Sequence, residues 1–144
     1  MKHDYYIASR YRNKEQVLEL AEKIRATGKS VYCFVETYDN KEDSIKNDNP
    51  HEVMAQWEAI TDWRNDPHVK ETHDRDLQAL KDSETLVLLL PAGKSSHVEV
   101  GIGYGLGKKL IVVGEQKETE SLYLIFSEFY ETIDDFIASI GKTN

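Results

Sequence analysis

Two carboxylates in this sequence interrupt regular patterns, and a carboxylate can act as nucleophile, base or acid. The first, Asp76, falls on the same helical face as Leu77 and Leu80, a face that should pack against a sheet. A carboxylate in that position needs hydrogen-bonding partners or a wet cavity. Either backbone N–H groups or a neighbouring arginine satisfy Asp76, or Asp76 lines a pocket.

The second carboxylate, Glu99, lies in a segment whose patterns conflict. In residues 94–107 apolar side chains alternate with Glu and Gly, which favours a strand, and the glycines disfavour a helix. However, the segment joins two apolar runs that should be parallel strands, and such a crossover normally contains a helix. Ser96 and Glu99 also have the spacing of a capping box. We expect a helix, with Glu99 either the capping glutamate or a reactive carboxylate near the positive helix end.

Other chemical motifs are weak or missing. The histidines and aspartates of residues 68–76 match no standard zinc spacing, so no metal site is expected. The glycines of residues 101–107 lack the GxGxxG spacing, and residues 93–95 lack the earlier glycine of a P-loop. The single cysteine, Cys33, excludes an intramolecular disulfide, and its apolar surroundings favour a buried thiol.

Alternating strands and helices must position these groups. Short apolar runs predict buried strands at residues 5–8, 31–35, 85–90 and 110–113, with an edge strand near 129–130. Helices are expected over residues 13–27, 52–65, 67–81 and 132–140, with a helical turn within 121–126. Asn13 and Asp66 should cap two of these helices, and Gly28 should end the first. In such a parallel sheet, ligands bind at the carboxyl ends of strands, here after Ala8 and Leu90.

Length and charge limit the class of protein. The 144 residues fit one domain spanning 1–144, and the net charge of −8 argues against a nucleic-acid polymer as partner. No signal peptide or membrane-spanning stretch is found, so a cytoplasmic protein without a membrane partner is expected. The acidic residues 36–49 are expected to form a mobile surface loop. Trp57 should lie in the core, and Trp63 should either stack on a base or lie at a subunit interface.

Three motifs together resemble the nucleoside 2-deoxyribosyltransferase superfamily. They are Tyr6-Ile7-Ala8-Ser9 with Arg12-Asn13, then Asp76-Leu77, and finally residues 91–101 (PAGKSSHVEVG). The sequence is most similar to the nucleotide N-glycosidase branch, which includes cytidine-monophosphate and hydroxymethyl-deoxyuridine-monophosphate hydrolases. The resemblance implies an α/β fold, a flavodoxin-like three-layer sandwich with a five-stranded parallel sheet of order 2-1-3-4-5. It also implies a homodimer or higher homo-oligomer.

The resemblance also implies roles for individual residues. Glu99 matches the nucleophile, Tyr6 the tyrosine beside it, and Asp76 the helical aspartate that contacts the sugar or aids proton transfer. Arg12 and Ser95 match phosphate contacts. The remaining residues expected to line the substrate site are Ser9, Gly93, Ser96 and His97, although His97 could equally be a surface side chain.

One departure from the family pattern bears on the substrate. The transferases carry an aspartate in the loop before the glutamate, whereas this sequence has only Gly93, Lys94 and two serines there. The expected activity is therefore hydrolysis of the N-glycosidic bond of a nucleoside 5′-monophosphate through a glycosyl-Glu99 intermediate, with no metal or organic cofactor. Base exchange between nucleosides and a non-catalytic nucleotide-binding domain are the alternatives.

Overall fold

Five parallel strands form a single sheet in the order β2-β1-β3-β4-β5. The computed structural model describes residues 1–39 and 49–141. The strands are β1 (His3–Ala8), β2 (Val31–Tyr32), β3 (Ser83–Leu89), β4 (Lys109–Val113) and β5 (Glu128–Tyr130). This order confirms the flavodoxin-like α/β topology expected from the sequence.

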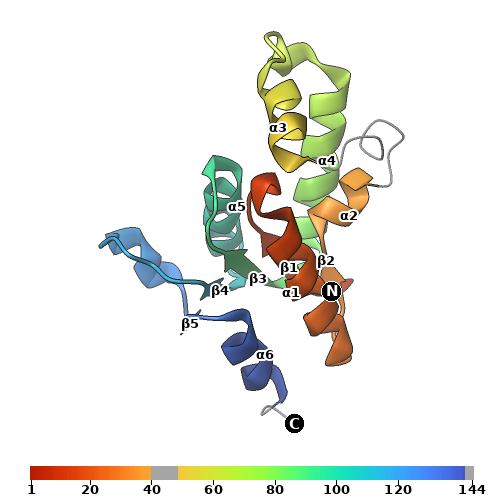
Figure 1. The fold of residues 1–144 in the computed structure, drawn as a ribbon. Coiled ribbons are helices and arrows are strands. Elements are labelled where there is room, and N and C mark those ends of the chain that lie inside the picture. The colour runs from red at the N-terminus through yellow and green to blue at the C-terminus, as the bar shows by residue number, and fades with distance from the viewer. Residues whose placement is uncertain (40–48, 142–144) are drawn as a thin grey trace.

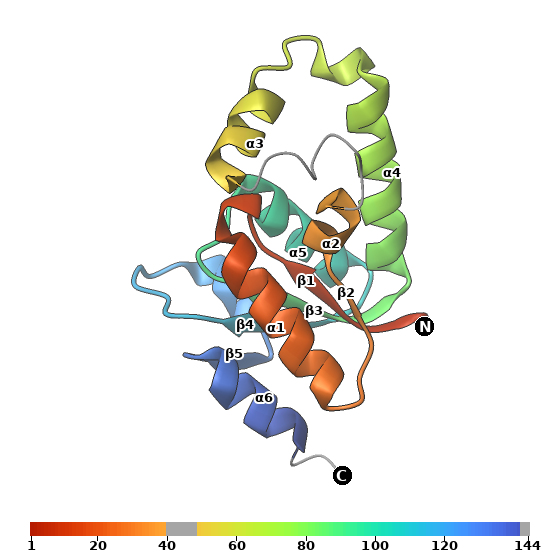
Figure 2. The same cartoon turned by 45° about the vertical axis from the view of Figure 1, so that its right-hand side comes forward.

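Helices cover both faces of the sheet and complete three layers (Figure 1). On one face lie α1 (Lys14–Ala26) and α6 (Ile133–Gly141), and on the other lie α4 (Pro67–Lys81) and α5 (Lys94–Gly105). Two shorter helices, α2 (Phe34–Asp39) and α3 (Pro50–Glu58), lie near the carboxyl ends of the strands with the first half of α4 (Figure 2). Short 3-10 turns are η1 (Tyr11–Asn13), η2 (Trp63–Asn65) and η3 (Ser121–Ile125).

The sheet separates two apolar cores because successive strand residues point to opposite faces. Ile7, Val87 and Ile111 pack with α1 and α6. Tyr6, Leu86 and their neighbours on the other face pack with α4 and α5. Cys33 is buried in the first core, and burial raises its thiol pKa to about 11, which confirms the prediction of a buried thiol. Among the described residues, no helix has the length and apolar character needed to cross a membrane.

Residues 94–105 are helical despite their alternating pattern, because they form the crossover between the parallel strands β3 and β4. Val100 and Gly103 face the sheet, whereas Val98 and Ile102 are exposed, so the alternation does not describe one buried face. The helix begins after Gly93, and Ser96 is its third residue. The predicted capping box of Ser96 with Glu99 is therefore wrong.

Three segments differ from the predictions by more than two residues at a boundary. The strand expected over 31–35 stops at Tyr32, because Cys33 and Val35 reach the first core from the turn that starts α2. The helix expected over 52–65 begins at Pro50 and stops at Glu58, since Thr61 beyond it is exposed and has no core to join. In the loop expected over 36–49, residues 36–39 complete α2 and Asn49 caps α3; residues 40–48 lie outside the described part of the chain.

Close packing of α5 against the sheet depends on Gly103. A Cβ atom placed on Gly103 would lie 2.6 Å from Leu86 Cδ2 and 3.3 Å from Leu110 Cδ2, whereas one placed on Gly101 or Gly105 would meet nothing within 4 Å. The spacing of small residues predicts that Gly101 and Gly105 let this helix approach the sheet or a partner closely. The approach to the sheet is made by Gly103 instead.

We expect Gly103→Ala to be less stable than Gly101→Ala and Gly105→Ala by about 1–3 kcal/mol in urea unfolding. Alanine gains roughly 1 kcal/mol of helix propensity at Gly101 and Gly103 and less at Gly105, the last residue of α5, but only Gly103→Ala overpacks the core. The other two variants are thus matched controls. Equal stability of the three proteins would contradict the assignment of Gly103 as the contact.

Candidate active site

A cavity of about 520 Å³ opens where the strand order reverses, between the carboxyl ends of β1 and β3. This is the place where open parallel sheets bind ligands. We call it the switch-point cleft. Its lining residues come from the end of β1 and the segment after it, from α2, α3 and α4, and from the start of α5: Tyr6, Ser9, Arg10, Tyr11, Arg12, Phe34, Met54, Trp57, Glu58, Thr72, Asp76, Gly93, Lys94, Ser95, Ser96 and Glu99.

Glu99 and Asp76, from different helices, are each held by a tyrosine of the sheet. The Tyr6 hydroxyl donates a hydrogen bond to Glu99 Oε2, and the Tyr32 hydroxyl donates one to Asp76 Oδ1 at 2.9 Å. Tyr6 and Tyr32 are partners in the β1–β2 register, and their rings stack with centroids 5.3 Å apart and planes at 14°. The pair of rings therefore sets the positions of both carboxylates.

Burial keeps the two tyrosines protonated and raises the pKa of Glu99. Burial is the main cause that raises the pKa of Glu99 to about 7; Asp76 adds to the rise, and the hydrogen bond from Tyr6 opposes it. Burial also raises the pKa of Tyr32 to about 12 and that of Tyr6 well above its usual value. Both hydroxyls thus remain donors near neutral pH, where Glu99 exists in both protonation states.

The start of α5 forms a polar corner of the cleft. Ser96 Oγ donates to the Gly93 carbonyl at 2.9 Å and accepts from the Gly93 N–H at 3.0 Å, which fixes the first turn. The first N–H groups of a helix have no partner within the helix, and with the helix dipole they favour an anion. Ser95 is exposed at the same corner. The structure thus brings Gly93, Ser95 and Ser96 together at this corner of the cleft.

Three cations surround this polar corner. Arg10, Arg12 and Lys94 all line the cleft, and a Cβ atom on Gly93 would lie 3.6 Å from Arg10 Cβ. Arg12 Nη1 donates to Glu58 Oε1 at 2.8 Å. The charge of Asp76 acts on Glu99, whereas those of Arg12 and Lys94 act on Glu58, so the cleft has a carboxylate end, made by Asp76 and Glu99, and a basic end.

Ser9 lies in the cleft wall, but its hydroxyl serves the backbone. Ser9 Oγ donates to the Leu89 carbonyl at 2.8 Å and accepts from Asn13 Nδ2 at 3.3 Å. These bonds join the end of β1 to the end of β3. Asn13, expected to cap α1 with its side chain, makes this contact instead of a cap bond.

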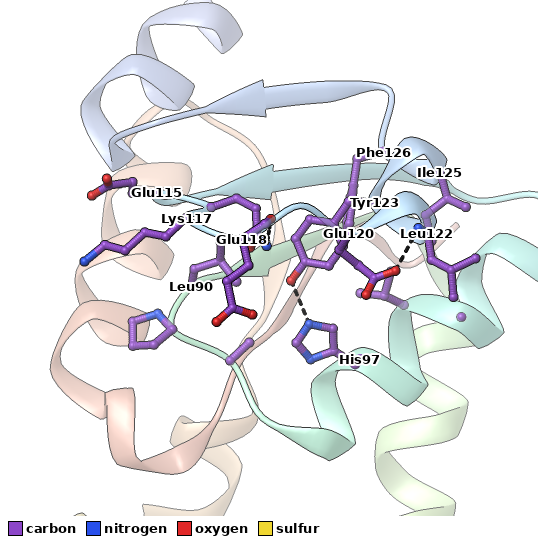
Figure 3. Close-up of a pocket in the computed structure, with 15 residues that line it drawn as sticks. Leu90, His97, Glu115, Lys117, Glu118, Glu120, Leu122, Tyr123, Ile125 and Phe126 are labelled. Atoms are coloured by element: carbon purple, nitrogen blue, oxygen red, sulfur yellow. Dashed lines mark hydrogen bonds between the residues drawn. The ribbon is translucent and has the colours of Figure 1, made fainter.

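The structure does not place His97 in the switch-point cleft. His97 Nδ1 lies 2.7 Å from the Gly93 carbonyl. Its Nε2 lies 2.7 Å from the Tyr123 hydroxyl, and the side chain points toward Tyr123 (Figure 3). There it borders a separate hollow of about 980 Å³, lined by Leu90, Phe126, Glu118 and other residues of the chain. That hollow contains neither Glu99 nor Asp76.

The sequence patterns did not predict most of the aromatic and apolar residues that line the cleft. Trp57, expected in the core, is only partly buried and lines the cleft beside Phe34 and Met54. Trp63, which is 49% exposed, lies under the Arg64 guanidinium and not in the cleft lining. Tyr32 was missed too, although strand parity and its pairing with β1 could have placed it beside Tyr6.

Within the described residues, no group of three or more His, Cys, Asp or Glu side chains could hold a metal ion. The side chains of the cleft are instead suited to an organic ligand with an anionic group. Its aromatic wall, carboxylate pair and basic end are distinct regions of one cavity.

Comparisons with known proteins support the fold. No family model and no curated protein matches the chain. A solved structure of a 2-deoxyribosyltransferase from the psychrotolerant bacterium Bacillus psychrosaccharolyticus is similar, with a TM-score of 0.67 and 17% sequence identity over 94% of each chain. This chain therefore has the fold of that enzyme.

The raised pKa of Glu99 predicts how stability changes with pH. Because the folded-state pKa, about 7, exceeds the ordinary value of 4.5, folding favours the protonated form. The resulting stabilisation is present at low pH and is lost as pH rises through about 7. From pH 5 to 8, we expect wild type to lose up to about 3 kcal/mol of unfolding free energy relative to Glu99→Gln.

Urea unfolding at several pH values measures this difference. Glu22→Gln, which removes an exposed carboxylate from α1, is the control and should follow wild type across the range. If wild type and Glu99→Gln keep a constant difference from pH 5 to 8, Glu99 is not held in a desolvated site.

Proposed function

We propose that this chain is an N-glycosidase that cleaves the bond between base and sugar in a nucleoside 5′-monophosphate. The observation that carries the proposal is the Glu99 carboxylate, fixed by Tyr6 and facing Asp76 at one end of a cleft whose other end is basic. A ligand with a sugar at the carboxylates and a phosphate at Arg12 and the start of α5 matches this polarity.

Cleavage proceeds in two displacements at the anomeric carbon. Tyr6 engages Oε2 of Glu99, so Oε1 attacks the anomeric carbon while the bond to the base nitrogen breaks and its electron pair leaves with the base. Asp76 or water protonates the departing nitrogen. The transition state has oxocarbenium character, which the carboxylate stabilises. Water then attacks the anomeric carbon and gives its proton to Asp76 or to solvent, whichever protonated the base. The bond to Glu99 Oε1 breaks with its electron pair returning to the carboxylate, which frees the sugar phosphate.

The proposed attack on the anomeric carbon depends on the protonation state of Glu99. Only the ionised carboxylate is a nucleophile, and with a pKa of about 7 its fraction rises as pH increases through neutrality. The hydrogen bond from Tyr6 favours the ionised form and opposes the effect of burial. Tyr6 is thus a positioning residue that also tunes the nucleophile.

Base exchange between nucleosides is the second candidate. The similar fold of the Bacillus psychrosaccharolyticus 2-deoxyribosyltransferase favours it, because that protein is described as a biocatalyst for the synthesis of nucleosides. The loop before Glu99 favours hydrolysis, since Gly93, Lys94 and the two serines supply no aspartate there. A non-catalytic nucleotide-binding domain needs the basic end but not a desolvated Glu99.

We further propose that the chain forms a homodimer or a higher homo-oligomer through the outer face of α5 and η3. Large apolar side chains are exposed on both elements, among them Val98 at 62%, Leu122 at 72% and Leu124 at 85%. The hydrogen bond and ring contact between His97 and Tyr123 hold α5 and η3 together, and exposed apolar side chains on adjoining elements are typical of a contact surface.

The activity test is release of free base from a panel of nucleosides and nucleoside 5′-monophosphates, followed by chromatography. We expect release from a monophosphate and a loss of at least about 100-fold in Glu99→Gln, which keeps the shape but not the nucleophilic charge. A second free base added to the mixture distinguishes exchange, which yields a new nucleoside. If no substrate releases base and ligands still raise the melting temperature, the protein is a binding module.

Oligomerisation is tested by light scattering on the eluting protein. Wild type should have the mass of two or more chains, and Val98→Asp should lower that mass because it places a charge on the apolar face. Glu22→Gln serves as the control for a single change in surface charge. A monomer mass for wild type at all concentrations would reject the second part of the proposal.

A further inference from the structure

Glu58 is the one acidic side chain at the basic end of the switch-point cleft among the residues that line it. It is the last residue of α3, a helix that contacts η1 beside Arg12. Its Oε1 accepts a hydrogen bond from Arg12 Nη1 at 2.8 Å. The Glu58 carboxylate is therefore already hydrogen-bonded to the Arg12 guanidinium, which is the group expected to bind the phosphate.

The charges around Glu58 make it resemble a bound anion. The hydrogen bond from Arg12 is the main cause that lowers the pKa of Glu58, and the charge of Lys94 lowers it further. Glu58 is thus ionised at neutral pH and is attracted by two of the three cations that line the cleft. A ligand phosphate would have to occupy the same electrostatic position.

The ion pair between Arg12 and Glu58 can exchange one partner for a ligand. The Glu58 side chain is 56% exposed and that of Arg12 is 30% exposed, so water competes with the pair and its contribution to stability is small. A phosphate carries up to two negative charges and presents several acceptor oxygens to the planar guanidinium. It can therefore displace a single carboxylate from Arg12.

We propose that Glu58 is a specificity-determining residue that competes with the ligand phosphate for Arg12. Binding of a phosphorylated ligand requires the Arg12–Glu58 ion pair to open, whereas an unphosphorylated nucleoside or sugar leaves it closed. Glu58 thereby lowers the preference for phosphorylated ligands below what the cations alone would give. This inference rests on the proposed function, since it takes the ligand to be a sugar with a 5′-phosphate.

The test is calorimetric titration of the full chain with 2-deoxyribose 5-phosphate and, separately, with 2-deoxyribose. Glu58→Gln keeps the size of the side chain but removes its charge, so we expect the phosphorylated sugar to bind roughly three- to tenfold more tightly. Binding of the unphosphorylated sugar should be unchanged. Glu22→Gln removes one charge from α1, outside the cleft, and should change neither affinity.

A double-mutant cycle shows whether the effect passes through Arg12. In an Arg12→Ala background, Glu58→Gln should no longer change the affinity for the phosphorylated sugar, because the guanidinium for which Glu58 and the phosphate compete has been removed. An equal gain in both backgrounds would show only a general change of charge and would overturn the proposal. A variant that weakens binding of the unphosphorylated sugar would instead make Glu58 a direct ligand contact, which also overturns it.

These measurements separate this inference from the proposed function. Binding of the sugar phosphate needs no base release, so a protein without hydrolase activity can still show the Glu58 effect. Conversely, base release with an unchanged affinity in Glu58→Gln would reject the competition alone. If neither wild type nor Glu58→Gln binds the sugar phosphate, the anion position at Arg12 is wrong as well.

Discussion

The hydrogen bond from Tyr6 to Glu99 is the interaction on which the site depends. Tyr6 is fully buried on a central strand, so its hydroxyl is a fixed point from which the helix carrying Glu99 is positioned. The same helix packs closely on the sheet at Gly103, against Leu86 and Leu110. The same geometry desolvates Glu99, which is why its pKa rises while its orientation is retained.

The division of the sheet into two faces gives the site its location. Residues that alternate along β1 serve different cores: Ile7 belongs to the face of α1 and α6, and Tyr6 to the face of α4 and α5. All the groups proposed to do chemistry lie on the second face or at its carboxyl edge. The first face contributes stability and part of the cleft wall, since Tyr11, Phe34 and Met54 belong to or pack against its core and line the cleft.

Much of this arrangement could be predicted because it depends on local pattern and topology. Apolar runs located the strands, the parallel crossover outweighed the misleading alternation in residues 94–105, and the motif resemblance brought Tyr6, Asp76 and Glu99 into one hypothesis. The rest depends on contacts between distant segments. Nothing in the order of residues places Glu58 on Arg12, turns His97 toward Tyr123, or selects Gly103 over its neighbours as the packing glycine.

The loose attachment of α3 has a consequence for how such a protein can change over time. None of its residues is fully buried, yet Met54, Trp57 and Glu58 form one wall of the cleft. The carboxylates and the tyrosines that hold them belong instead to elements anchored on the sheet. Substitutions in α3 can therefore alter this wall of the cleft while the carboxylates, the tyrosines and the folded core stay intact. Among the described α-helices, α3 is the one without a buried residue, so it is the part of the cleft that can change at the least cost to stability.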